Sequence, residues 1–89
     1  MLKRDIEITN KLGLHARAAA KLVKAAGAFI SSIEIEKQDQ RVNAKSIMSV
    51  MMVAASRGNT VSLYVEGEDQ EDAMAAVVEL IEDKFGEDE

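Results

Sequence analysis

Hydrophobic and polar residues alternate along three stretches of the chain, which is the pattern of a β-strand with one buried face. The alternating stretches are residues 5–9, 32–36 and 61–66. A fourth, shorter strand is expected at residues 41–43, because Gln38 and Asp39 suit a tight turn after the second strand. The alternation and the turn together predict four half-buried strands.

In three other stretches the apolar residues recur every three or four positions, which is the spacing of one helix face. The first helix is predicted at residues 16–26, where alanine is frequent and loses little on entering a helix. Ser46 is suited to cap a second, short helix that we expect to end near residues 57–58. Asp69 is placed to cap the third helix, and Gly86 to end it. The buried faces are expected at Ala19, Leu22, Val23 and Ala26 on the first helix, and at Ala73, Ala76, Val77, Leu80 and Ile81 on the third.

These elements follow one another in the order β-α-β-β-α-β-α. Half-buried strands and one-sided helices predict an α+β fold in which the helices cover one face of a mainly antiparallel sheet. The 89 residues leave room for one domain, which we expect to span residues 1–89. The element order by itself would also suit a ferredoxin-like metallochaperone or a small-molecule sensor domain.

Composition excludes several classes of protein. The 11 basic and 16 acidic residues leave a net charge of −5, which disfavours nucleic acid and anionic membranes as partners, because both require a positive face. The chain has no cysteine, so disulfides and thiolate metal sites are excluded. Its longest nearly apolar stretch, residues 47–55, is far shorter than the ~20 residues of a membrane-spanning helix, and its start is too polar for a signal peptide. We expect a soluble protein of the cytoplasm.

The single histidine, His15, lies where the first helix begins. The backbone N–H groups of a helix start lack partners within the helix, and the positive end of the helix dipole lies there too. Arg17 adds a cation at the same place, so the site suits an anion, and phosphate in particular. A neutral imidazole keeps a lone pair on one nitrogen, so His15 is a candidate to carry a phosphoryl group itself. An ordinary surface histidine is the alternative.

Other chemistry at His15 lacks the residues that it needs. One histidine without cysteine cannot close a zinc site, and no carboxylate stands at ligand spacing from it, so no metal is expected. No serine or aspartate is linked to it by a catalytic-triad motif. The glycines are scattered singly, so the sequence has no Gly-rich nucleotide loop, and no cofactor is expected.

A second informative stretch is residues 47–53, which are apolar on nearly all sides of the expected helix. A small sheet covered on one face can bury only one side of such a helix. We therefore expect Ile47, Met48 and Met51 to be partly exposed and to form a docking surface, because flexible methionines adapt to partners of different shape. The alternative is a helix that belongs to the core alone.

The chain carries two separate motifs, Gly13-Leu14-His15-Ala16-Arg17 ahead of the alanine-rich helix, and Lys45-Ser46-Ile47-Met48 followed by Val50-Met51. They resemble the active-site and regulatory segments of the HPr family, the histidine phosphocarriers of the bacterial phosphotransferase system. Arg57-Gly58 ahead of a strand and the closing amphipathic helix also resemble the family pattern. The resemblance covers essentially the whole chain.

This resemblance implies an open-faced β-sandwich, a four-stranded antiparallel sheet with three helices on one face. It implies that His15 accepts a phosphoryl group from enzyme I, which obtains it from phosphoenolpyruvate, and passes it to an enzyme IIA. The ring nitrogen nearer the backbone would carry the group, held by the Arg17 guanidinium and by the backbone amides of Ala16 and Arg17. Ser46 matches the site that an ATP-dependent HPr kinase/phosphorylase modifies.

Two positions depart from the family pattern. Ala18 replaces the usual proline after the arginine, which we expect to loosen the helix start slightly, and Ser49 replaces the usual glycine on the docking helix. Asn10-Lys11-Leu12-Gly13 resembles a segment of the nitrogen-related branch of the family. We expect a monomeric phosphocarrier that is not itself an enzyme. The alternative is a regulatory binding module of the same fold that acts mainly through protein contacts.

Overall fold

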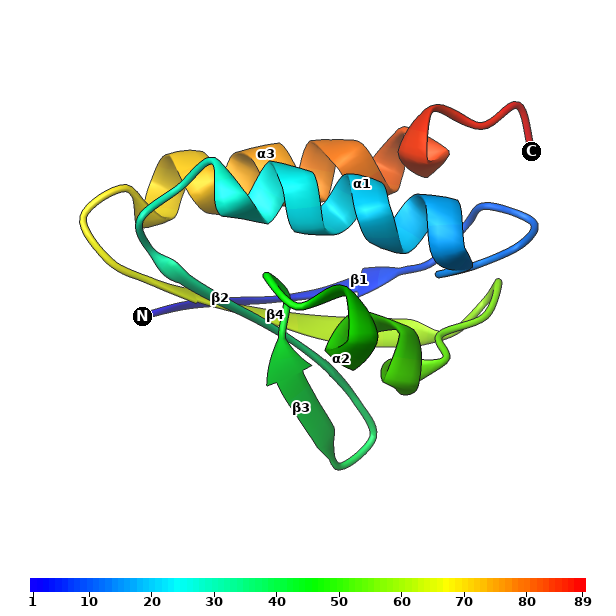
Figure 1. The fold of residues 1–89 in the computed structure, drawn as a ribbon, viewed down its shortest axis with the longest axis horizontal. Coiled ribbons are helices and arrows are strands. Elements are labelled where there is room, and N and C mark those ends of the chain that lie inside the picture. The colour runs from blue at the N-terminus through cyan, green and yellow to red at the C-terminus, as the bar shows by residue number, and fades with distance from the viewer.

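Four antiparallel strands form a single sheet in the order β1-β4-β2-β3 (Figure 1). The computed structural model describes all 89 residues, and its strands are β1 (Leu2–Glu7), β2 (Ser32–Lys37), β3 (Gln40–Asn43) and β4 (Thr60–Glu66). β1 and β2 both pair with β4, and β3 pairs with β2 across the turn at residues 38–39. The four strands and the turn that the sequence predicted are confirmed.

One face of the sheet is apolar because the strand register brings the buried side chains together. Ile6 lies opposite Val61, Ile35 lies opposite Leu63, and all four side chains are buried. Successive side chains of a strand point to opposite faces, so a register that aligns these residues gathers them on the same face. β1 begins earlier and ends earlier than the alternation at residues 5–9 predicted.

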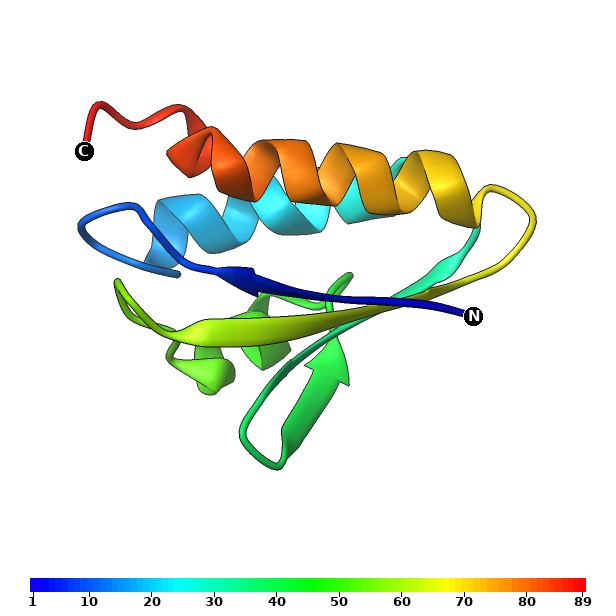
Figure 2. The same ribbon diagram turned by 180° about the vertical axis from the view of Figure 1, so that it is seen from behind.

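Three helices complete the fold. α1 (Ala16–Gly27) and α3 (Gln70–Glu82) run side by side over the sheet, and α2 (Ile47–Val53) packs against α1 and β3 (Figures 1 and 2). The third helix ends at Glu82 and not at Gly86 as the sequence predicted, and a short 3-10 turn, η1 (Lys84–Gly86), follows it. None of the helices has the length and apolar character that spanning a bilayer requires. The architecture is the open-faced sandwich that the resemblance implied.

The buried face of α1 differs from the predicted one at a single position. Ala19, Leu22 and Ala26 are fully buried as expected, whereas Val23 is only partly buried and Ala18 takes its place in the core. On α3, Ala73, Val77 and Ile81 are buried as expected. Ala76 and Leu80 are instead half-buried, and Met74 and Val78 are buried. The buried face of α3 is therefore rotated relative to the predicted face, because the helix contacts α1 on one side as well as β1 and β4 beneath it.

The second helix ends four to five residues earlier than the sequence predicted. Ser46 is its N-cap, as expected, and its Oγ accepts a hydrogen bond from the Ser49 amide at 3.4 Å. The helix stops at Val53 because Ala54 adopts a left-handed conformation, with φ of 53°. The next residue, Ala55, is buried, and its carbonyl accepts a hydrogen bond from the Leu14 amide at 2.9 Å. Residues 54–58 thus form a loop that contacts the segment before α1.

Asp69 precedes α3 as expected, but its carboxylate does not cap that helix. It accepts hydrogen bonds from the amides of Ile30 and Ser31, both at 2.9 Å, and from the Ser31 hydroxyl at 2.5 Å. The Ser31 hydroxyl is the main cause that lowers the pKa of Asp69, and the two amides act in the same direction against the effect of burial. Asp69 therefore ties the β4–α3 connection to the segment between α1 and β2.

Candidate functional site

His15 lies at the N-cap position of α1, in the extended conformation that precedes a helix, with φ of −70° and ψ of 176°. The loop before it is held against the residues that follow α2. A Cβ atom on Gly13 would stand 2.4 Å from the Ala55 carbonyl oxygen, and the φ of Gly13 is +63°. Leu14 is buried, which anchors the loop next to the histidine. A glycine and a buried leucine therefore set the position of His15.

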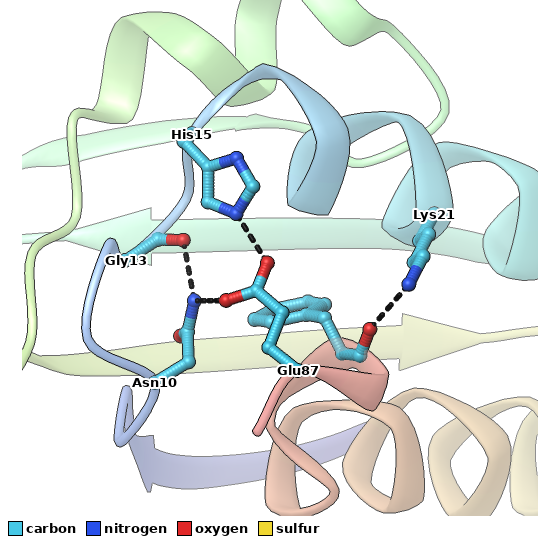
Figure 3. Close-up of polar contacts among 6 residues, drawn as sticks. Asn10, Gly13, His15, Lys21 and Glu87 are labelled. Atoms are coloured by element: carbon cyan, nitrogen blue, oxygen red, sulfur yellow. Dashed lines mark hydrogen bonds and ion pairs between the residues drawn. The ribbon is translucent and has the colours of Figure 1, made fainter. Parts of the chain in front are cut away.

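The His15 ring contacts a residue from the far end of the chain. Its Nε2 is hydrogen-bonded to Oε2 of Glu87, and Figure 3 shows the other ring nitrogen on the far side of the ring from that carboxylate. Asn10 completes the cluster, because its Nδ2 donates to Glu87 Oε1 at 2.9 Å and to the Gly13 carbonyl at 2.8 Å. The side chains of His15 and Glu87 are 26% and 18% exposed, so the pair is partly shielded from water.

The chain after α3 is positioned by several independent contacts. Phe85 is fully buried, and its carbonyl accepts a hydrogen bond from Lys21 Nζ on α1 at 2.6 Å (Figure 3). Gly86, directly before Glu87, has a φ of 77°, a conformation that favours glycine. The Lys11 amide donates to the Glu89 carbonyl at 2.9 Å. These contacts hold Glu87 beside His15.

The side chain of Glu87 is held in its ionised form at this site. The hydrogen bond from Asn10 is the main cause that lowers the pKa of Glu87, and the contact with His15 adds to it, while burial acts in the opposite direction. The sequence analysis did not identify Asn10 or Glu87 as site residues. The signal available for Glu87 is weak: Phe85 is an isolated large apolar residue after the predicted apolar stripe of the last helix, which suggests that the chain end packs back onto the core.

Arg17 and the start of α1 face an open hollow of about 510 Å³ next to His15, and the acidic residues 87–89 line the same hollow. Arg17 is exposed and takes part in none of the ion pairs of the structure, so its guanidinium is available to an anion. The amides of Ala16 and Arg17 belong to the first helical turn, where N–H groups have no intrahelical acceptor. His15, Ala16 and Arg17 thus meet in one place. No three metal-ligating side chains come together in the structure.

The predicted docking residues are exposed, as the sequence pattern indicated. Ile47, Met48 and Met51 expose 40%, 71% and 42% of their surface, whereas Val50 and Val53 of the same helix are buried. α2 packs against α1, the helix that begins at His15. The three residues form an apolar surface on α2, which we call the α2 patch.

The comparison with known proteins agrees with the fold and with the motifs. A family model described as the PTS HPr component phosphorylation site matches residues 2–83. The chain is 53% identical to the phosphocarrier protein HPr of Cupriavidus necator over 89 residues, which cover all of both chains.

Two solved structures are also similar. The crystal structure of HPr-C-His from Thermoanaerobacter tengcongensis superposes with a TM-score of 0.96 at 53% identity and covers both chains completely. The crystal structure of the HPr dimer from the same organism gives a TM-score of 0.79 at 54% identity and covers 98% of this chain and 100% of that one. The chain therefore belongs to the HPr family, the phosphocarrier proteins of the phosphotransferase system.

Proposed function

We propose that His15 accepts a phosphoryl group from enzyme I and passes it to an enzyme IIA. The observation that carries the proposal is the arrangement at the start of α1. A partly exposed imidazole, an exposed arginine without an ion pair and the free amides of a first helical turn border one open hollow. A dianionic phosphoryl group needs a nucleophile, a cation and N–H donors, and this arrangement offers all three.

The transfer would be a direct exchange between two nitrogen atoms. The lone pair of the His15 ring nitrogen attacks the phosphorus atom carried by enzyme I. The nitrogen–phosphorus bond to enzyme I breaks, and its electron pair returns to the donor nitrogen. The Arg17 guanidinium and the amides of Ala16 and Arg17 would stabilise the negative charge on the transferring oxygens. Transfer to an enzyme IIA follows the same steps in reverse, so the protein acts as a carrier and a substrate rather than as an enzyme.

The α2 patch is the surface that we propose for docking of enzyme I and of enzyme IIA. Its apolar side chains are exposed on a helix that contacts α1, so a partner seated on it would lie beside the histidine. Successive partners must each reach this surface, which favours a carrier that works as a monomer. The cytoplasm is the compartment that we propose for it. A dimer of a related HPr has been crystallised, so sedimentation of the free protein is the direct check on its oligomeric state.

Ser46 is the residue that we propose as a regulatory phosphorylation site for an HPr kinase/phosphorylase. It lies directly before the α2 patch, and its hydroxyl caps the helix that carries the patch. A phosphate there would add about two negative charges beside apolar side chains that a partner must cover. Docking would weaken because a charge without a partner is costly to desolvate.

A regulatory binding module of the same fold is the competing function. Such a module would act through Ser46 and the α2 patch and would have no use for His15 or Arg17. Incubation with phosphoenolpyruvate and enzyme I separates the two functions. A carrier gains an acid-labile, base-stable phosphate, and His15→Ala abolishes that gain while the circular dichroism spectrum stays unchanged. A parent protein that gains no phosphate, or an alanine variant that still gains it, would refute the proposal.

A further inference from the structure

Glu87 uses both of its carboxylate oxygens in the cluster around His15. Oε1 accepts the hydrogen bond from Asn10, and Oε2 is bonded to Nε2 of the ring. An ionised carboxylate can only accept hydrogen bonds, so the ring nitrogen that faces it must carry the proton. A neutral His15 is then protonated on Nε2 and has its lone pair on Nδ1, the nitrogen nearer the backbone.

The orientation of the Asn10 amide supports this assignment. Its Nδ2 donates to Gly13 and to Glu87, whereas its Oδ1 is buried without a hydrogen-bond partner. The two hydrogen bonds that Nδ2 donates stabilise this orientation by more than the unpaired oxygen destabilises it. In the reversed amide, the oxygen would face two acceptors and could bond to neither. Asn10 therefore presents donors to Glu87, and Glu87 presents an acceptor to the ring.

Glu87 lines the same hollow as His15 and Arg17, and the chain that precedes it is anchored in the core. Phe85 is buried two residues before Glu87, and Lys21 binds the Phe85 carbonyl. The carboxylate approaches the ring from the side opposite Nδ1 (Figure 3). A partner that reaches Nδ1 therefore need not displace Glu87.

We propose that Glu87 is a positioning residue that keeps Nδ1 of His15 as the phosphoryl acceptor. The inference rests on the proposed function, because it assumes that His15 receives the phosphoryl group. A bond forms between Nδ1 and phosphorus, and the bond from phosphorus to the donor nitrogen breaks, with its electron pair returning to the donor. The proton on Nε2 stays in place throughout. The Glu87 carboxylate compensates the positive charge that the ring gains when Nδ1 shares its lone pair.

Glu87→Gln tests the proposal with little change of shape. The glutamine side chain has one accepting oxygen, so it can satisfy either the ring proton or the Asn10 amide, and its own NH₂ then faces the other donor. When that NH₂ faces the ring, the lone pair must sit on Nε2 and the proton on Nδ1. The ring ¹⁵N chemical shifts report this exchange at about pH 9, where histidines are ordinarily neutral. We expect the variant to gain the Nδ1–H form and to accept phosphate from enzyme I about tenfold more slowly.

Asp83→Asn is the matched control, because it removes one negative charge from the same terminal segment and Asp83 makes no side-chain capping hydrogen bond or ion pair. Its ring shifts and transfer rate should equal those of the parent. A Glu87→Gln protein with parental ring shifts or a parental transfer rate would overturn the role of Glu87 but not the proposed function. A parent protein that accepts no phosphate would overturn the proposed function as well.

Discussion

Gly13 and Ala55 approach each other so closely that no side chain fits between them. A Cβ atom on residue 13 would lie 2.4 Å from the Ala55 carbonyl oxygen and 2.9 Å from the Ser56 Cα atom, and both obstacles are backbone. The adjacent Leu14 amide donates to the same Ala55 carbonyl at 2.9 Å. This contact fixes the loop that carries His15 to the loop that follows α2.

We predict that Gly13→Ala lowers the free energy of unfolding by more than about 2 kcal/mol, because alanine is strained at positive φ and its Cβ forces the two backbone segments apart. Urea denaturation measures the loss. Gly27→Ala is the control, since no atom lies within 4 Å of a Cβ there and alanine is the better helix former. The control should be neutral or gain up to about 1 kcal/mol. Equal stability of the two variants would contradict the prediction.

Arg17 is expected to act in transfer rather than in folding. The guanidinium offers paired donors to phosphate oxygens, a geometry that an ammonium group cannot reproduce. Arg17→Lys should slow phosphoryl exchange with enzyme I by roughly tenfold, which corresponds to about 1.4 kcal/mol of transition-state stabilisation. The thermal midpoint should stay unchanged, because Arg17 is exposed and makes no ion pair. Arg4→Lys, outside the hollow, should exchange at the parental rate. An unaltered rate in Arg17→Lys would mean that Arg17 is an ordinary surface charge.

Met48 is the most exposed residue of the α2 patch. Met48→Glu should weaken binding to enzyme I by about tenfold or more, because an interface would have to desolvate the new carboxylate without pairing it. Isothermal titration measures the affinity, and thermal unfolding should show little change. Ile30→Glu is the control, since Ile30 is equally exposed but lies beyond the C-terminal end of α1. If both variants bind enzyme I equally well, the α2 patch is not the docking surface.

Ser46→Asp is expected to reduce docking without unfolding α2. A carboxylate at an N-cap position is well tolerated, so the thermal midpoint should hold or rise. The enzyme I concentration needed for half-maximal phosphorylation should rise, by about tenfold, because the charge lies beside the α2 patch. Ser46→Asn, a neutral residue that also caps helices, should behave as the parent does. Parental phosphorylation of the aspartate variant would leave Ser46 with a capping role only.

The Asp69 carboxylate makes stability depend on pH. Its pKa is lowered in the folded protein, chiefly by the Ser31 hydroxyl, so the folded state favours the ionised form more than the unfolded chain does. The resulting stability is present above the ordinary pKa of 3.8 and is lost as the pH falls through the lower folded value. Asp69→Asn should be less stable at neutral pH and should lose less stability than the parent on acidification. Urea denaturation at several pH values measures both. Asp72→Asn, an exposed position in the first turn of α3, should keep the parental slope.

The alternation of apolar and polar residues was sufficient to predict three of the four strands, because a strand with one buried face must alternate wherever it lies in the sequence. The fourth strand, β3, was predicted from the turn at residues 38–39. The site around His15 could also be predicted in part. Its glycine, histidine and arginine stand within one short segment, so the geometry of the loop and the first helical turn is local. Ser46 is likewise a local cap, formed by a hydroxyl and an amide three residues apart.

Tertiary packing decided the rest. α2 ends at Val53 because Ala55 is drawn into contact with the segment before α1. Asp69 binds Ser31 rather than its own helix, because the two connections meet at one edge of the fold. Glu87 reaches His15 across 72 positions of sequence. No local pattern encodes that contact, since it exists only once Phe85 is buried and α3 lies against α1.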